Sequence, residues 1–237
     1  MISILGMKID SLSFQEVLKK AEVLIEKQKK SFVVTLNPEM IIAAQKDEQF
    51  KRIINRADLI VPDGFGLMLA AKFLGQPLKE RITGVDLTWA LMKLAEERGY
   101  SVFMLGAGPG VAKKAAQNIK LVHPNLKING ISSADPDDQE IIKTIRRAKP
   151  DILFVAYGAP KQEKFISYLL SRISIPLAMG VGGTFDYIAG VYPYAPRWIR
   201  KAGLEWLYRL CTQPKRFDRI ITGTIRFPWA ILRSKFK

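Results

Sequence analysis

The sequence predicts an α/β protein: a doubly wound, Rossmann-like domain with a mainly parallel sheet, followed by a basic, aromatic, α-helical C-terminal appendage. Short apolar runs alternate with longer segments whose apolar residues recur every three or four positions, as strands and helices require. Five of the runs end in a small or polar loop. Because ligands bind beyond the carboxyl ends of parallel strands, the loops at 35–39, 62–64, 106–110, 158–163 and 180–184 are expected to converge on one crevice.

The first quarter of the chain already alternates strands and helices. Ser13 and Glu16 form the capping-box pattern that starts a helix, and apolar residues follow at helical spacings. The elements expected here are a strand near 2–9, a helix at 13–25, a strand at 32–35, helical segments at 40–44 and 50–55, and a strand at 59–61.

The middle of the chain continues this alternation. Gly99 ends one helix and Pro150 stops another, as these residues commonly do. The elements expected here are a helix at 85–98, a strand at 102–105, a helix at 111–121, a strand at 127–131, a helix from about 138 to 148, and strands at 152–156 and 177–179.

The end of the chain differs in composition from the rest. Pro193 and Pro196 interrupt the pattern, and from Arg197 onward eleven lysines and arginines stand against two acidic residues. Trp, Phe and Ile are interleaved with these bases. We therefore predict one main domain at 1–196 and the appendage at 197–237.

The composition limits the number of domains, the type of partner and the presence of disulfides. The 237 residues are 48% hydrophobic, which suits one sizeable core, and the net charge of +15 favours an anionic partner such as a membrane surface, a nucleic acid or a diphosphate. Cys211 is the single cysteine, so it forms no internal disulfide and offers no metal-ligand spacing. We expect no cleaved secretory signal, because the N-terminus has no positive region followed by a long apolar one, and no spanning helix, because no apolar stretch reaches about 18 residues.

Polar side chains follow two of the expected strands. Asp63 stands on a strand-end turn, where a carboxylate can act as a general base, although a Pro-Asp-Gly triplet equally fits an ordinary turn. Thr35, Asn37 and Glu39 add a hydroxyl, an amide and a carboxylate suited to a polyol. Asn37 also fits a helix cap with Pro38 at the first helical position. Asn37 can both cap a helix and bind a polyol.

Glycine-rich loops follow two further strands. The loop with Gly106 and Gly108 resembles a phosphate loop but departs from the G-x-G-x-x-G pattern. The loop of Gly182 and Gly183 leads to Thr184 and Asp186, which suits phosphate or ribose binding. A tight turn with a helix-capping threonine is the alternative for this loop.

Cationic and amide donors complete the candidate site. Gly158, Lys161 and Gln162 lie where a helix begins, so they can meet a diphosphate or a sugar hydroxyl, or form only a solvated first turn. The tail arginines can bind phosphate oxygens through paired N–H groups. They are Arg209, Arg216 and Arg219.

Two further features are expected to be structural. Asp135 and Asp137 match the D-x-D spacing that binds a divalent metal through sugar-nucleotide phosphates, but they precede a helix that acidic residues commonly cap. His123 has no neighbouring motif that would make it part of a catalytic triad or a metal site.

Six ordered motifs together carry a resemblance that spans almost the whole chain. They are TLNPEM at 35–40, PDGFG at 62–66, ERITGVD at 80–86, GAPKQE at 158–163, GVGGTFD at 180–186 and GLEWLYRL at 203–210. In these motifs the chain resembles the TagA/WecG/CpsF family of bacterial glycosyltransferases. The resemblance implies inverting, metal-independent transfer of a hexose derivative from a UDP-sugar to a polyprenyl-diphosphate-linked sugar, with no cofactor, at the cytoplasmic face of the membrane.

The resemblance also implies roles for individual residues. Asp63 matches the general base that takes the acceptor hydroxyl proton, and Gln162 falls on an active-site position. Thr35 and Asn37 would position sugar, while Arg81 would bind the leaving diphosphate or the acceptor. The residues implied to hold the nucleotide or to close over the site are Gly182, Gly183, Asp186, Arg209, Arg216 and Arg219.

Substrate and partners follow from the same resemblance. N-acetylmannosamine is the expected donor sugar and polyprenyl-diphosphate-linked GlcNAc the expected acceptor, in teichoic acid or surface-polysaccharide synthesis; UDP-glucose and UDP-N-acetylmannosaminuronic acid are the alternative donors. We expect the appendage to dock on an anionic membrane and to complete the cleft, and homo-oligomers are left open. A non-catalytic nucleotide-sugar binding module is the rival interpretation, and a nucleic-acid partner is not expected because no recognisable module is present.

Overall fold

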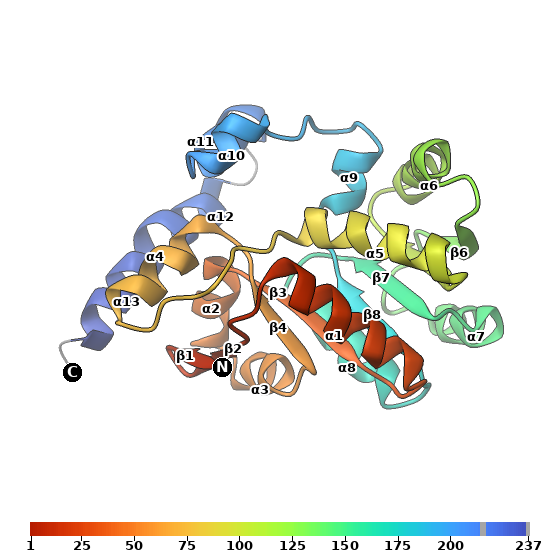
Figure 1. The fold of residues 1–237 in the computed structure, drawn as a ribbon, viewed down its shortest axis with the longest axis horizontal. Coiled ribbons are helices and arrows are strands. Elements are labelled where there is room, and N and C mark those ends of the chain that lie inside the picture. Colours follow the sequence, from red (N-terminus) through yellow and green to blue (C-terminus); the bar gives the residue numbers. More distant parts are fainter. Residues whose placement is uncertain (214–216, 236–237) are drawn as a thin grey trace.

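A six-stranded parallel sheet forms the centre of the computed structural model, which describes residues 1–213 and 217–235, and the side chains of all of these except residues 139, 197 and 201. The strand order is β4-β3-β8-β7-β5-β6, with every neighbouring pair parallel (Figure 1). The strands are β3 (Phe32–Leu36), β4 (Leu59–Pro62), β5 (Ser101–Gly106), β6 (Lys127–Ser132), β7 (Ile152–Ala156) and β8 (Leu177–Gly180). The predicted doubly wound α/β fold is confirmed.

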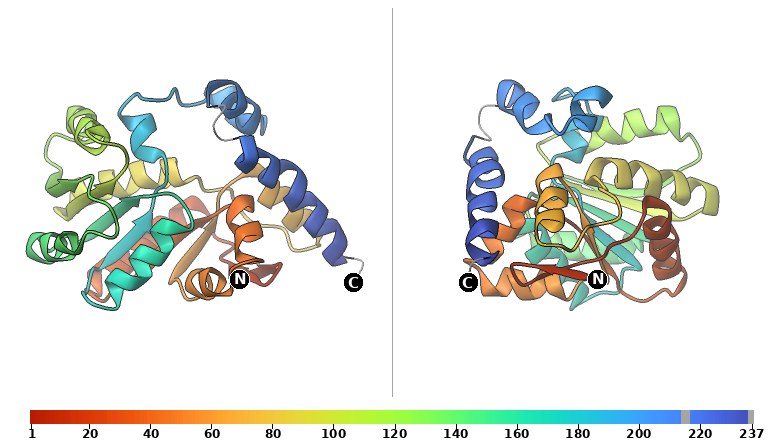
Figure 2. Two further views of the ribbon diagram at one scale, coloured as in Figure 1. Left: turned by 180° about the vertical axis from the view of Figure 1, so that it is seen from behind. Right: turned by 60° about the vertical axis from the view of Figure 1, so that its left-hand side comes forward.

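Helices cover both faces of the sheet (Figure 2). One face carries α1 (Phe14–Glu26), α5 (Gly84–Arg98), α6 (Val111–Val122) and α9 (Thr184–Ile188). The other face carries α2 (Pro38–Ala44), α3 (Glu48–Asn55), α4 (Phe65–Phe73), α7 (Gln139–Ala148) and α8 (Lys161–Leu170).

The sheet is apolar on both faces because both faces are covered. In β7, Leu153 and Val155 join one buried cluster, whereas Ile152 and Phe154 join the other. The sequence of a strand that is buried on both sides is therefore a continuous run of apolar residues. Full burial of a side chain such as Phe154 contributes roughly 1.5–3 kcal/mol relative to exposure.

Local signals in the sequence set several helix ends. Ser13 Oγ accepts a hydrogen bond from the Glu16 backbone N–H at 3.3 Å, and the Glu16 carboxylate accepts one from the Ser13 N–H at 2.7 Å. Gly99 ends α5 with a φ of 73°, and the Asp138 side chain caps α7. These ends agree with the predicted boundaries.

Two local expectations differ from the structure. The single strand expected near residues 2–9 is wrong, because β1 (Ile2–Ile4) and β2 (Met7–Ile9) form an antiparallel hairpin. Leu5 and Gly6 make its turn with φ values of 50° and 75°, a geometry usually marked by Asn-Gly rather than Leu-Gly. Helix α4 was not predicted, since its residues are apolar along most of their length and give no polar face to alternate with an apolar one.

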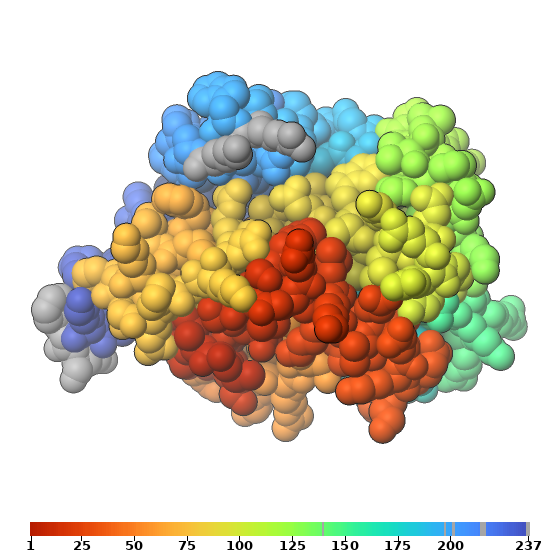
Figure 3. All heavy atoms as spheres, viewed as in Figure 1, coloured from red at the N-terminus to blue at the C-terminus, as the bar shows by residue number. Residues whose placement is uncertain are grey.

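The C-terminal part is helical, as predicted. It comprises α10 (Arg197–Lys201), α11 (Glu205–Thr212), α12 (Phe217–Ile221), a π-helical stretch η2 (Thr222–Arg226) and α13 (Phe227–Lys235). Phe227 and Ile231 are buried in the same cluster as the α2 and α4 core residues. In the space-filling view the blue C-terminal helices meet the orange atoms of α4 (Figure 3). The domain boundary at residue 197 stays a prediction.

Within the described ranges no helix combines the length and the apolar character that crossing a bilayer requires.

Candidate active site

Four of the five predicted loops meet at one cavity beyond the ends of β3, β4, β7 and β8. The predicted site residues that line it, among those described, are Thr35, Asn37, Asp63, Gly158, Gln162, Gly182, Gly183, Thr184, Arg209 and Arg219. The cavity therefore combines a carboxylate, two threonine hydroxyls, side-chain amides and two guanidinium groups. Parallel strands bring these groups together because their carboxyl ends share one edge of the sheet.

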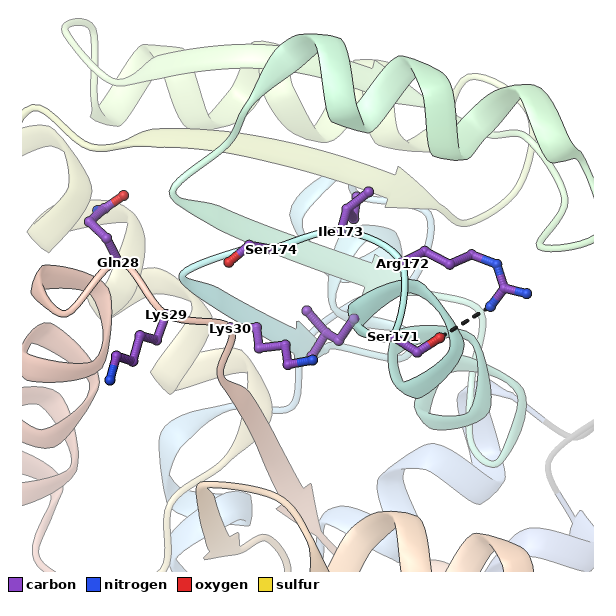
Figure 4. Close-up of a pocket in the computed structure, with 8 residues that line it drawn as sticks. Gln28, Lys29, Lys30, Ser171, Arg172, Ile173 and Ser174 are labelled. Atoms are coloured by element: carbon purple, nitrogen blue, oxygen red, sulfur yellow. Dashed lines mark hydrogen bonds between the residues drawn. The ribbon is translucent and has the colours of Figure 1, made fainter.

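A larger hollow lies at the opposite end of the strands. It measures about 450 Å³ against about 90 Å³ for the first cavity, and its walls include Lys29, Lys30 and Arg172. Figure 4 shows its side chains, where Ser171 Oγ accepts a hydrogen bond from the Arg172 guanidinium at 3.1 Å. Since the residues lining this hollow include no carboxylate, size alone does not locate the chemistry.

Asp63 occupies the end of β4, where the chain turns into α4. The half-buried carboxylate accepts a hydrogen bond from the Gly84 backbone N–H at 3.1 Å. Removal from water, and after it the negative charge of Glu205, raise the pKa of Asp63, which lies at about 6. The Gly84 hydrogen bond and the charges of Arg209 and Arg81 act in the opposite direction. A carboxylate with such a pKa is ionised at neutral pH and accepts a proton more readily than an ordinary aspartate.

The start of α5 holds Asp63 close to Thr35. A Cβ placed on Gly84 would lie 3.2 Å from Thr35 Oγ1 and 3.7 Å from Asp63 Oδ2. Thr83 anchors this helix end, since its Oγ1 atom accepts from the Asp86 N–H at 3.1 Å and donates to the Asp86 carboxylate at 2.7 Å. Glycine at position 84 therefore permits the close approach of three segments.

Gln162 ties two of the loops together. Its Oε1 atom accepts hydrogen bonds from the backbone N–H groups of Gly158 and Gly182, each at 3.0 Å. Its Nε2 atom donates to the carboxyl group of Glu163 at 2.7 Å. A Cβ on Gly180 would collide with this amide. The two N–H groups are thus engaged within the protein, and the Gln162 side chain bridges the loops that carry Gly158 and Gly182.

Glu163 is a buried carboxyl group behind the cavity. Its side chain is 2% exposed, and burial raises its pKa to about 7. Its Oε2 atom has no hydrogen-bond partner among the residues that the structure describes. Burial of an unpartnered oxygen favours the protonated form of the group.

Asn37 and Thr184 combine local and site roles. Asn37 Oδ1 accepts from the Met40 N–H at 3.0 Å and so caps α2, with Pro38 following, as the capping interpretation predicts. This bond uses the carbonyl oxygen, which leaves the NH₂ group able to donate to a ligand. The Thr184 hydroxyl donates to the Val181 carbonyl at 2.7 Å at the start of α9.

The appendage supplies the cationic side of the cavity. Arg209 pairs with Glu205 at 2.5 Å and lies over the Tyr187 ring at 5.7 Å. Arg219 donates to the Glu39 carboxylate at 2.7 Å. The guanidinium groups thus come from helices more than a hundred residues beyond Asp63 and face the same space. Arg216 lies outside the described residues.

Other predicted residues stand outside the cavity wall. Gly106 ends β5, one strand beyond β7, and a Cβ there would lie 2.9 Å from the Ala156 carbonyl oxygen. This glycine permits close strand packing, and Gly108 follows it in the same loop. Lys161 points to Asp135, with 3.9 Å between Nζ and Oδ1.

Arg81 and Asp186 also stand outside that wall. The Arg81 charge lies near enough to lower the pKa of Asp63. The Asp186 carbonyl accepts from the Val191 N–H at 2.9 Å, which closes the turn after α9.

Three other expectations concern metals and histidine. The described residues contain no group of three His, Cys, Asp or Glu side chains gathered to hold a metal ion. Asp138, next to the D-x-D spacing, caps α7. His123 Nδ1 lies 2.8 Å from Glu96 Oε2, in a structural contact away from the cavity.

Sequence reasoning missed several contributors to the site. Gly84 and Glu205 lie inside quoted motifs, yet nothing in their spacing points to Asp63. In the sequence, Glu163 resembles an ordinary acidic residue in the first turn of α8, and Tyr187 resembles an ordinary aromatic residue of a helix. Only the packing of distant segments brings Gly84 and Tyr187 to the cavity wall, places the charge of Glu205 near Asp63 and buries Glu163 behind the cavity.

Comparison with known proteins agrees with the motifs. The sequence model of the glycosyl transferase WecG/TagA/CpsF family matches residues 2–237. Relatives named N-acetylglucosaminyldiphosphoundecaprenol N-acetyl-beta-D-mannosaminyltransferase include one from Bacillus spizizenii, 35% identical over 84% of this chain and 77% of the relative. Those from Bacillus subtilis and Staphylococcus aureus are 34% and 33% identical, over 89% and 100% of this chain and 82% and 94% of the relatives. The chain belongs to the glycosyl transferase WecG/TagA/CpsF family.

Proposed function

We propose that this glycosyltransferase moves N-acetylmannosamine from a UDP-sugar to undecaprenyl-diphosphate-linked GlcNAc, with inversion at the anomeric carbon. The observation that carries the proposal is the Asp63 carboxylate, whose pKa is raised to about 6 in a cavity that Arg209 and Arg219 also line. The names of the relatives supply the sugar and the acceptor. In the cell the product would serve synthesis of a surface polymer such as teichoic acid.

The chemical step needs one base and one stabilised leaving group. The Asp63 carboxylate takes the proton from the acceptor hydroxyl while that oxygen forms a bond to the anomeric carbon. The bond from the anomeric carbon to the diphosphate oxygen breaks, and its electron pair leaves with UDP. Attack from the face opposite the leaving group inverts the configuration.

Arginine side chains supply the positive charge that stabilises the leaving group. Negative charge develops on the departing diphosphate, and preorganised cationic donors stabilise such charge most effectively in a site shielded from water. Arg209 and Arg219 line the cavity, and the charge of Arg81 already acts on Asp63. We therefore propose a transfer that requires no divalent metal and no cofactor.

The enzyme would work as a peripheral protein on the inner face of the cell membrane. The appendage combines exposed aromatic side chains, Trp198, Trp206 and Trp229 among them, with basic residues. Such a composition suits an interface rich in anionic lipid, where each base near the surface contributes on the order of 1 kcal/mol. Docking would bring the cavity to a lipid-linked acceptor.

UDP release by the full chain tests the proposal. The assay presents UDP-N-acetylmannosamine, UDP-N-acetylmannosaminuronic acid and UDP-glucose in EDTA, each with and without a short-chain polyprenyl-diphosphate-GlcNAc acceptor. We expect acceptor-dependent release from UDP-N-acetylmannosamine alone. Release from another donor would overturn the sugar assignment, dependence on added metal would overturn the metal-free mechanism, and silence across the panel would favour a non-catalytic binding module.

A further inference from the structure

Helix α4 presents a partly exposed apolar face. Phe65, Leu69 and Phe73 are 42%, 54% and 45% exposed and follow one another at intervals of four residues. Side chains at this spacing lie on one side of a helix. The opposite side packs into the core through Leu67 and Ala71. The main domain itself therefore carries a row of large apolar side chains in contact with solvent.

The appendage borders this row at its far end. Helix α13 packs against α4, and the two run side by side (Figures 1 and 2). Lys235 Nζ lies 4.0 Å from the centre of the Phe73 ring and donates to the Phe73 carbonyl at 3.2 Å. Trp229 and Leu232 of α13 are exposed as well. Helix α13 thus adds further exposed apolar side chains next to α4.

The appendage also borders the row at its near end. A Cβ on Gly203, in the turn between α10 and α11, would lie 2.8 Å from Phe65 Cδ1. Trp206 and Leu207 on α11 are exposed beyond this contact. Appendage segments therefore border α4 at both ends, and each of these segments carries exposed apolar side chains of its own.

The charges on these helices have a single sign. Neither α4 nor α13 contains an acidic residue, whereas Lys72, Arg233 and Lys235 are exposed on them and Arg226 directly precedes α13. Aromatic and aliphatic side chains flanked by flexible bases fit the boundary between lipid headgroups and acyl chains. An anionic bilayer matches both the apolar face and the charge.

We propose that α4 of the main domain is part of the bilayer-contacting surface, with Phe65, Leu69 and Phe73 seated among lipid headgroups. This inference rests on the membrane docking and lipid-linked acceptor of the proposed function. Gly64, directly after Asp63, is the N-cap of the helix, whose nine residues span about 13 Å. Contact through α4 would therefore fix the depth of the Asp63 carboxylate relative to the bilayer, at the level where a lipid-linked diphosphate sugar projects.

Vesicle flotation of the full chain tests this inference. The double variant Leu69→Ser with Phe73→Ser is compared with Leu121→Ser with Val122→Ser, a matched pair on α6 whose residues are 84% and 61% exposed. We expect the α4 variant to bind phosphatidylcholine–phosphatidylglycerol vesicles at least ~10-fold more weakly than the unmodified chain, because two apolar side chains are lost from the contact. The α6 variant should bind as the unmodified chain does, and both should melt as it does, because all four residues are exposed.

Three results would overturn the inference. The first is that the α4 variant binds vesicles as the unmodified chain does. The second is that the α6 variant loses as much binding as the α4 variant. The third is that sedimentation shows the α4 substitutions to dissociate a dimer instead. Binding is measured without substrates, so it is independent of UDP release. Loss of transfer with normal vesicle binding would count against the proposed chemistry and leave the α4 surface standing.

Discussion

The side-chain amide of Gln162 donates a 2.7 Å hydrogen bond to the buried carboxyl group of Glu163, the next residue in the chain. This bond fixes the orientation of the amide, so that Oε1 faces the N–H groups of Gly158 and Gly182. The loops after β7 and β8 are thereby held in a fixed position relative to each other. The cavity wall on this side depends on a carboxyl group that does not line it.

Replacing Glu163 with Gln should remove a pH dependence of stability. The pKa of Glu163 is raised to about 7 in the folded protein from an ordinary value of 4.5, so the folded state binds its proton more tightly than the unfolded state. Its contribution to the free energy of unfolding is therefore fully present below pH 4.5 and is lost as the pH rises through 7. Urea unfolding at pH 5 and pH 8 should show a smaller drop for Glu163→Gln than for the unmodified chain.

The exposed Glu97 provides the control for this comparison, since its side chain is 57% exposed. Glu97→Gln should keep the drop seen in the unmodified chain. An equal drop in Glu163→Gln and the unmodified chain would show that Glu163 does not carry this pH dependence.

Replacing Gln162 with Ala should loosen the cavity. The partly buried N–H groups of Gly158 and Gly182 lose their acceptor, and an unsatisfied polar group costs up to about 1–3 kcal/mol when it is shielded from water. We expect a lower free energy of unfolding by about 2 kcal/mol or more and a raised KM for the UDP-sugar. Gln49→Ala, at an exposed position on α3, is the matched control and should change neither. Unchanged stability and KM in Gln162→Ala would refute the bridging role.

Replacing Gly84 with Ala should impair transfer more than folding. The added Cβ would lie 3.2 Å from Thr35 Oγ1, closer than ordinary van der Waals contact, and so would displace Thr35 relative to Asp63. We expect kcat/KM to fall by about tenfold or more, since small displacements at a reacting centre have large effects on rate. Gly66→Ala, whose Cβ would lie an ordinary 3.6 Å from Pro38, serves as the control. Equal kcat/KM values in the two variants would contradict the close-packing argument.

The pH profile of transfer should report Asp63. The base must be ionised to accept a proton, so kcat/KM should rise with pH and level off above about 6, where the pKa of Asp63 lies. The negative charge of Glu205 raises that pKa. Glu205→Gln should therefore move the acidic limb of the profile to lower pH. A limb that stays in place, or moves to higher pH, would show that another group governs it.

Much of the site followed from the sequence because strand ends are easy to find. Asp63, Thr35, Asn37 and Gln162 each follow an apolar run, and parallel strands bring their carboxyl ends to one edge. The order of the strands does not follow from the sequence, and β5 lies one position beyond β7. Strand order therefore decides that Gly106 stays outside the cavity wall.

The remaining features depend on packing between distant segments. Glu205 acts on Asp63 only because the appendage folds back over the cavity, and the burial of Glu163 depends on which side of α8 faces the sheet. Helix α4 lacks the alternation of polar and apolar faces that reveals a helix, because part of its apolar surface is exposed rather than buried. The exposed apolar side chains of α4 therefore explain both why the sequence pattern did not reveal the helix and why we propose that it contacts lipid.

Turnover and donor binding by Asp63→Asn test the central claim most directly. Asparagine keeps the size of the side chain but cannot take the acceptor proton, and loss of a general base lowers rates by about 10²–10⁴-fold. We predict such a loss of acceptor-dependent UDP release, with the Kd for the UDP-sugar within about threefold of the unmodified value. Asp137→Asn, at an exposed position, should leave both unchanged. Full turnover by Asp63→Asn would contradict the assignment of Asp63 as the base.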